Sequence, residues 1–193
     1  ATATIEVRVN AGAYAAVASG AASSALNLNV GANPIDVRVT AQDGTTLKTY
    51  TITVTRAASA NADLSALSST AGALTPGFAS GTTSYTASVG NGTTSVTVTP
   101  TVADATATIE VRVNAGAYAA VASAAASSAL NLNVGANPID VRVTAQDGTT
   151  LKTYTITVTR AASSNADLSA LSSTAGALTP GFASGTTSYT ASV

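Results

Sequence analysis

Apolar and polar residues alternate along most of the chain. In the segment TIEVRVN, Ile109, Val111 and Val113 fall on one side of the alternation, and charged or polar residues fall between them. The segments IDVRVT (139–144) and TYTITVT (153–159) repeat this pattern. Successive side chains of a strand point to opposite faces, so a period of two predicts antiparallel strands with one face on a shared core.

Turn signals such as GNGT, VGANP and AQDGT separate the alternating segments. The predicted strands cover residues 64–75, 83–89, 94–102, 107–114, 129–134, 138–145 and 151–159. The alanine-rich segment 115–128 is predicted to be a long loop with a weak strand. Pro100 predicts an edge or a bulge, because proline donates no ladder hydrogen bond. About seven short strands in about 100 residues are typical of an all-β, immunoglobulin-like β-sandwich.

The sequence of residues 1–89 is written again as residues 105–193. The two copies differ at two of the 89 aligned positions, Gly20/Ala124 and Ala60/Ser164. A period of 104 residues suits one globular domain per repeat and is too long for most solenoids. We therefore expect sandwich repeats arranged as beads on a string.

The segment TRAASAN (55–61) follows an alternating strand and lacks large apolar residues, which is typical of a short linker. The complete repeat is therefore expected at residues 62–161. Residues 1–57 are predicted to be the later strands of a preceding sandwich, and residues 166–193 the first strands of the following one. The predicted loss of core contacts falls on Ile5, Val7, Ile52 and Val54. We expect the chain to be a window on a longer array; the alternative is that the tail of one molecule completes the head of the next, which leaves a split domain short of one strand.

Two pairs of opposite charges are predicted on the outward faces of neighbouring antiparallel strands. Glu110 is expected to meet Arg142, and Arg112 is expected to meet Asp140. Facing charges help to set the register of a sheet, at roughly 0.2–1 kcal/mol per pair. We interpret them as a register device and not as a ligand site.

Two segments, 64–89 and 134–160, resemble the bacterial cadherin-like β-sandwich domain. The most specific parts are LTPGF (74–78), followed by Tyr85, and the ending that runs from DGT to YTITVTR (147–160). The resemblance covers the whole repeat. It implies tandem domains in a large secreted or surface-anchored bacterial protein, an extracellular location, and a structural or adhesive role. It carries no catalytic residues over.

Histidine, cysteine, methionine and tryptophan are all absent from the 193 residues. An imidazole base, a thiolate and an imidazole metal ligand are therefore excluded. Charged residues make up 9% of the chain and the formal net charge is −1, so no basic surface for nucleic acid or an anionic membrane is expected. We predict no enzyme activity, no cofactor, and no catalytic, cofactor-binding or metal-binding residues.

Calcium requires about six to eight oxygen ligands, with several carboxylates converging. The acids of the first repeat period are Glu6, Asp36, Asp43, Asp63 and Asp104. None of them belongs to a D-x-D or similar cluster, which disfavours a calcium site between repeats. Asp147, in the segment QDGT, is predicted to be a turn residue.

Three further features have to be weighed as signs of specialised chemistry: Lys152, the threonines of 153–159, and Tyr118. Lys152 is expected to face outward at the start of its strand, which disfavours an internal isopeptide bond to asparagine. The alternating threonines of 153–159 resemble an ice-binding array, but a single strand of a twisted sheet forms no flat array, and β-propensity explains the row. Tyr118 is the one aromatic residue whose burial the pattern does not predict, and it marks a candidate position for a weak glycan or peptide site.

The function that these observations favour is structural. We expect a tandem-repeat segment of a bacterial extracellular or cell-surface stalk or filament, in which parallel pairing of 83–89 with 151–159 resists load. The alternative is an accessory glycan- or protein-binding module of a secreted adhesin or enzyme. A mean hydropathy of +0.32 with few charges predicts self-association with neighbouring repeats or chains, without membrane insertion.

Overall fold

The computed structural model describes residues 2–193. Its strands are β1 (Thr4–Val9), β2 (Ala15–Val17), β3 (Gly31–Thr40), β4 (Leu47–Arg56), β5 (Leu64–Ser69), β6 (Ser84–Val89), β7 (Ser95–Val96), β8 (Val98–Val102), β9 (Thr108–Val113), β10 (Ala119–Val121), β11 (Leu130–Asn131), β12 (Gly135–Thr144) and β13 (Leu151–Arg160). The described residues form strands, turns and bends, and no helix. The predicted all-β class is confirmed.

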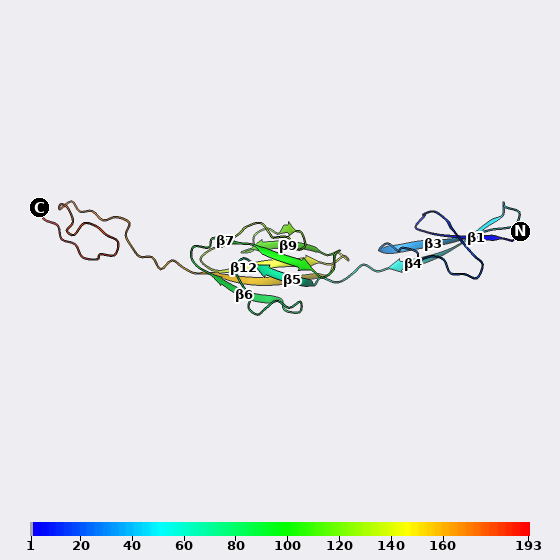
Figure 1. Ribbon diagram of the computed structural model, residues 1–193, viewed down its shortest axis with the longest axis horizontal. Coiled ribbons are helices and arrows are strands. Elements are labelled where there is room, and N and C mark those ends of the chain that lie inside the picture. Colours follow the sequence, from blue (N-terminus) through cyan, green and yellow to red (C-terminus); the bar gives the residue numbers. More distant parts are fainter. Residues whose placement is uncertain (1) are drawn as a thin grey trace.

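One layer of the central sandwich is a five-stranded sheet in the order β10-β9-β12-β13-β6 (Figure 1). Strands β9, β12 and β13 are antiparallel neighbours, with Val111 opposite Val141 and Ile139 opposite Ile156. Strand β6 runs parallel to β13 and places Tyr85 opposite Ile156. Both the antiparallel pair and the parallel pair expected from the sequence are therefore confirmed.

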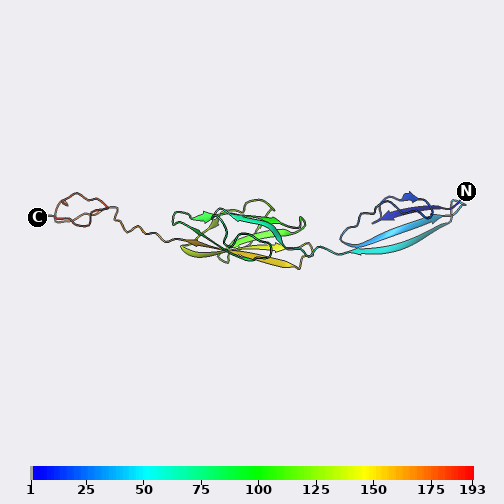
Figure 2. The same cartoon turned by 60° about the horizontal axis from the view of Figure 1, so that its bottom comes forward.

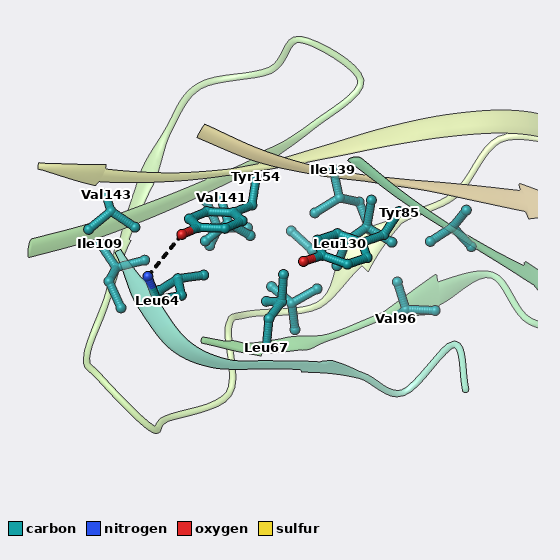
Figure 3. Packing of buried hydrophobic residues seen from close by; sticks show 14 of the residues in the cluster. Leu64, Leu67, Tyr85, Val96, Ile109, Leu130, Ile139, Val141, Val143 and Tyr154 are labelled. Carbon is teal, nitrogen blue, oxygen red and sulfur yellow. Dashed lines mark hydrogen bonds between the residues drawn. The ribbon is translucent and has the colours of Figure 1, made fainter. Parts of the chain in front are cut away.

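The opposite layer consists of two short antiparallel pairs, β5 with β8 and β7 with β11. Leu67 lies opposite Pro100, and the register shifts between Leu64 and Ala66. Pro100 thus belongs to a two-stranded pair with an irregular partner, as its missing N–H donor predicts. Figure 3 shows the apolar side chains that fill the space between this layer and the larger sheet.

The core is built from alternate residues of the strands, as the period of two predicts. Its fully buried members in β12 and β13 are Ile139, Val141, Val143, Tyr154, Ile156 and Val158. Leu64, Leu67, Tyr85, Val96, Val98, Ile109, Val111, Leu130 and Leu132 complete most of the cluster. Burial of each large apolar side chain contributes about 1.5–3 kcal/mol, so this cluster is the main source of stability.

The strand bounds differ from the sequence prediction at three places. The strand predicted at 64–75 ends at Ser69, after which the N–H of Thr70 donates to the carbonyl of Thr97 over 3.0 Å. The strand predicted at 94–102 is divided at Thr97, whose own N–H donates to the hydroxyl of Thr70 over 2.8 Å. The predicted strand 129–134 contracts to two residues, while β10 supplies the weak strand expected within 115–128.

The N-terminal part forms a separate four-stranded sheet in the order β2-β1-β3-β4. Its register is that of the central sheet, because Ile35 lies opposite Ile52 as Ile139 lies opposite Ile156. Ile52 is 57% exposed whereas Ile156 is fully buried, in agreement with the predicted loss of contacts. For Val7 that prediction is wrong, since this side chain is 8% exposed on a strand that has neighbours on both sides.

Residues 166–193 form turns and one isolated bridge, between Thr179 and Thr190. Figures 1 and 2 show the N-terminal sheet, the central sandwich and this segment following one another along the longest axis. Ser59 lies in the connection before the sandwich and forms hydrogen bonds with residues at the end of the sandwich. Its N–H donates to Oε1 of Gln146 over 3.0 Å, and its carbonyl accepts the N–H of Asp147 over 3.1 Å.

Candidate functional site

Four charged side chains and one tyrosine gather on the outward face of β9 and β12. We call this cluster, made of Glu110, Arg112, Tyr118, Asp140 and Arg142, the charged face. Arg112 is 2.8 Å from Asp140, and Arg142 is 2.7 Å from Glu110. Both predicted pairs therefore form, and their partners face one another directly in the β9–β12 register. The hydrogen bond that the Arg142 guanidinium donates to Glu110 raises the pKa of Arg142.

Tyr118 lies beneath both arginines of the charged face. The guanidinium carbon of Arg142 is 4.0 Å from the ring centroid, and that of Arg112 is 4.5 Å away. Each contact has the geometry of a cation–π interaction, worth about 0.5–1 kcal/mol at an exposed site. The ring of Tyr118, the candidate position for a glycan or peptide site, is therefore already in contact with two arginines of its own sheet.

The N-terminal sheet carries the same cluster. Arg8 and Arg38 lie 4.6 and 3.9 Å from the ring centroid of Tyr14. Arg38 is 2.7 Å from Glu6, and Arg8 is 2.9 Å from Asp36. Because this sheet has no second layer within residues 2–57, the cluster requires only the strands that carry it.

The remaining acids serve turns and chain junctions. Asp147 accepts the N–H groups of Thr149 and Thr150 over 2.9 and 2.8 Å, and the hydroxyl of Thr150 over 2.6 Å. These bonds, led by the hydroxyl of Thr150, lower the pKa of Asp147 to about 2. A hydrogen bond from the Ser59 side chain does the same for Asp104, whose pKa falls to about 2. Asp147 is therefore a turn residue, as predicted.

The described residues hold no group of three acids, histidines or cysteines that could bind a metal ion. The five acids considered for calcium are dispersed. Glu6 and Asp36 bind arginines, Asp43 binds its own turn, Asp63 binds a lysine, and Asp104 binds Thr106. Every one of these carboxylates is thus committed to a separate local partner.

Lys152 does not face open water, which corrects the expectation from its position in the strand. Its Nζ donates to Oδ1 of Asp63 over 2.7 Å and to the carbonyl of Ser80 over 2.8 Å. The bond to Asp63 raises the pKa of this lysine. The ion pair fastens the start of the sandwich to the start of β13, since Asp63 directly precedes β5.

Two functional side chains of the fold escaped the sequence analysis. Asn137 is fully buried, and its Nδ2 donates to the carbonyls of Asn133, Gly135 and Val158 over 2.8, 2.9 and 3.2 Å. Its Oδ1 accepts the N–H of Asn133 and the Nδ2 of Asn114 over 2.8 and 2.9 Å. An asparagine inside an apolar strand, directly before a proline, is the sequence signal that could have identified this buried hydrogen-bonding side chain.

Tyr154 is the second such side chain. Its hydroxyl accepts the N–H of Leu64 over 3.0 Å (Figure 3). The same hydroxyl donates to the carbonyl of Ser80, also over 3.0 Å. The period of two places this tyrosine on the apolar face of its strand, and its hydroxyl also joins the two layers. Because the residues it joins lie far apart along the chain, no local pattern reveals this role.

The threonines of β13 alternate with its buried residues, as the period of two predicts. Thr155 donates its hydroxyl to Oδ1 of Asp140 over 2.9 Å, so this member of the row extends the hydrogen bonds of the charged face. Strand β13 is also an inner strand, with β12 and β6 as neighbours. The threonine row therefore belongs to the sheet's own bonding.

No helix long and apolar enough to cross a bilayer occurs in the part of the chain that the structure describes. In sequence, the chain matches no curated protein. Among solved structures it is similar to the fibronectin(III)-like modules of Clostridium thermocellum CbhA. That similarity has a TM-score of 0.30 and 17% identity, and it covers 82% of this chain and 78% of that chain.

A family match is found for the N-terminal sheet and for the central sandwich. Residues 1–57 and 64–161 match the cadherin-like beta sandwich domain. Domains of this kind are typically non-catalytic structural or binding modules, and they usually lie outside the cell. The paired layers around a shared core agree with that match. The chain belongs to the family of cadherin-like beta sandwich domains.

Proposed function

We propose that this chain is a structural tandem-repeat segment of a bacterial extracellular or cell-surface stalk or filament. It provides length and cohesion without catalysis. The observation that carries the proposal is the repeat itself, whose two copies differ at two of 89 aligned positions. Arrays of near-identical domains are more often used for length or multivalency than to duplicate an active site.

The chemistry of the charged face supports this proposal. Arg112 and Arg142 each bind a carboxylate and the ring of Tyr118. Groups that recognise ligands elsewhere are here bonded to one another, so a ligand would have to break these contacts to use them. The cluster stabilises the pairing of β9 with β12, so its role is structural.

The position of the chain junctions also suits a stalk. The chain enters the sandwich before β5 and leaves it after β13, at opposite ends of the unit (Figure 1). At about 3.3 Å per residue, strands of ten residues give each unit a length of about 35–45 Å with its connection. Tension along this axis shears the parallel β6–β13 pair, so its ladder bonds are loaded together.

The proposal is tested by recombinant arrays of increasing copy number. We expect the maximum dimension measured by small-angle X-ray scattering to grow in proportion to the number of repeats. Single-molecule stretching should show equal unfolding steps, one for each repeat. A maximum dimension that stops growing with copy number would contradict a stalk.

The competing function, an accessory binding module, is tested on the same material. A glycan array and a pull-down are run with the chain and with the double variant Tyr14→Ala/Tyr118→Ala, which removes the ring from both copies of the cluster. Saturable binding that the variant loses would favour a binding module over a stalk. Absence of binding with proportional growth in length supports the stalk.

A further inference from the structure

We propose that successive repeats are joined by an anchored hinge, in which both neighbouring units hold the connection by hydrogen bonds and a single alanine remains free. The chain contains this connection twice, as TRAASAN (55–61) and TRAASSN (159–165), which differ at one position. Each residue of one connection therefore has an equivalent in the other. The inference does not depend on the stalk function, because binding modules in tandem would be joined in the same way.

The upstream unit holds the connection at Ala161. The N–H of Ala161 donates to the carbonyl of Val89 over 3.0 Å, and its carbonyl accepts Nδ2 of Asn91 over 3.1 Å. The preceding residue, Arg160, donates to the carbonyls of Asn91 and Leu132 over 2.9 and 3.0 Å. These partners all belong to the complete sandwich, so the chain leaves this unit with both peptide groups of Ala161 fixed.

The downstream unit holds the connection from Ser59 onward. The N–H of Ser59 donates to Oε1 of Gln146 over 3.0 Å, and its carbonyl accepts the N–H of Asp147 over 3.1 Å. Its side chain forms a further hydrogen bond with the carboxylate of Asp104. Gln146 and Asp147 lie between β12 and β13, whereas Asp104 follows β8, so two separate loops of the complete sandwich hold this one serine.

The stretch between Ser59 and β5 is ordered by its own side chains. The N–H of Asn61 donates to the Ser59 hydroxyl over 3.2 Å, and the N–H of Asp63 donates to Oδ1 of Asn61 over 2.9 Å. Asp63 also pairs with Lys152 over 2.7 Å. This stretch is therefore part of the downstream unit and adds no free length to the connection.

The two anchors lie two residues apart, because Ser59 is the equivalent of Ser163. The upstream anchor uses the N–H and carbonyl of Ala161, and the downstream anchor uses the atoms of the serine, so both can form at once. The residue between them is Ala162. In the part of the chain that the structure describes, neither Ala162 nor its equivalent Ala58 takes part in a hydrogen bond.

A hinge of one residue limits how far two repeats can tilt. The peptide group before Ala162 is bonded upstream, and the equivalent of the peptide group after it is bonded downstream. Because peptide groups are planar, the φ and ψ angles of Ala162 are the free backbone torsions of the joint. The Cβ atom of alanine excludes much of the φ/ψ space that glycine reaches. We therefore expect a stiff joint that needs no bound ion.

The test uses the chain lengthened by one period of 104 residues, so that two complete repeats follow one another. The sequence contains no cysteine, and Thr153 is exposed. Thr153→Cys in each complete repeat therefore places the only two spin labels, and double electron–electron resonance measures the distribution of distances between them. We expect a single narrow distribution that neither calcium nor a chelator changes.

Two substitutions separate the anchors. Gln146→Ala in the downstream repeat removes the acceptor for the serine N–H, so the narrow distribution should be lost. The matched control is the same substitution in the upstream repeat, where Gln146 holds the preceding connection and not the measured joint. Asn91→Ala should show the reverse dependence, with loss of the narrow distribution from the upstream repeat and no change from the downstream repeat.

The 193-residue chain gives a second readout. Nitrogen-15 relaxation should show backbone order parameters of about 0.85 at Ser59 and Ala161, which is the value of a rigid backbone. Gln146→Ala should lower the order parameter of Ser59 toward about 0.6 and leave that of Ala161 unchanged. An order parameter below about 0.6 at Ser59 in the unmodified chain would overturn the downstream anchor.

Three outcomes of the distance measurement would overturn the inference. The first is a broad distribution in the unmodified chain. The second is an equal effect of Gln146→Ala in either repeat, because that result would reflect general destabilisation. The third is a distribution that becomes narrow only with calcium, because hydrogen bonds would then not suffice. Growth of the maximum dimension with copy number tests the stalk separately, since a flexible array also lengthens as repeats are added.

Discussion

Tyr50 and Tyr154 lie at the same position of two identical strands, yet Tyr50 is 52% exposed and Tyr154 is fully buried. The hydroxyl of Tyr154 accepts the N–H of Leu64 over 3.0 Å. Leu64 lies in β5, a strand from the other layer of the sandwich. The environment of this tyrosine is therefore decided by a segment 90 residues away along the chain.

Tyr154→Phe should lower the free energy of unfolding of the central sandwich by about 1–3 kcal/mol, because the buried N–H of Leu64 loses its acceptor. Tyr50→Phe is the matched control and should change stability by less than about 0.5 kcal/mol, as expected of an exposed site. Urea unfolding followed by tyrosine fluorescence or circular dichroism measures both. Equal effects of the two substitutions would contradict the assigned role of the hydroxyl.

Asn137→Ala should destabilise the sandwich by about 3–5 kcal/mol, because it leaves several buried backbone groups without partners. Asn131→Ala, at an exposed position of β11, should have an effect within about 0.5 kcal/mol. Thermal unfolding of each variant gives the comparison. A destabilisation of less than about 1 kcal/mol by Asn137→Ala would mean that water takes the place of the amide as hydrogen-bond partner of these backbone groups.

Ala124→Gly should stabilise the sandwich by about 0.5–1 kcal/mol. Ala124 has a φ of 62°, in the left-handed region, and the first copy of the repeat has Gly20 at this position with a φ of 77°. Glycine adopts this conformation without the steric cost of a Cβ atom, and the gain exceeds its entropy loss. Differential scanning calorimetry should show a higher melting temperature. A lower melting temperature would contradict the argument that the positive φ strains the backbone at Ala124.

Acid should weaken the sandwich through Asp147. The pKa of Asp147 falls from 3.8 to about 2 on folding, so its stabilisation is fully present above about pH 4 and is lost as the pH falls through about 2. Asp147→Asn should therefore lower the melting temperature at pH 7 and flatten its dependence between pH 4 and pH 2. Asp43→Asn changes the equivalent turn of the N-terminal sheet and should leave the transition of the sandwich unaltered.

The sequence by itself determined the β-sandwich class, the repeat and the apolar faces of the strands. These features depend on alternation along each strand, as at Ile139, Val141 and Val143, and alternation is a local property. It also determined the two ion pairs of the charged face, because Arg112 and Asp140 face one another once β9 and β12 pair in the register set by their apolar residues. The N-terminal sheet forms the same pairs without a second layer, between Arg8 and Asp36.

Only the tertiary structure decided which copies of a side chain are buried. Ile52 and Ile156 have the same neighbours along the chain, but only Ile156 is covered by a second layer. It also decided that Lys152 binds Asp63, an interaction across 89 residues, and that the strand predicted to extend to residue 75 ends at Ser69. Burial and long-range hydrogen bonds depend on how the layers meet, and alternation within a strand specifies a face without specifying what covers it.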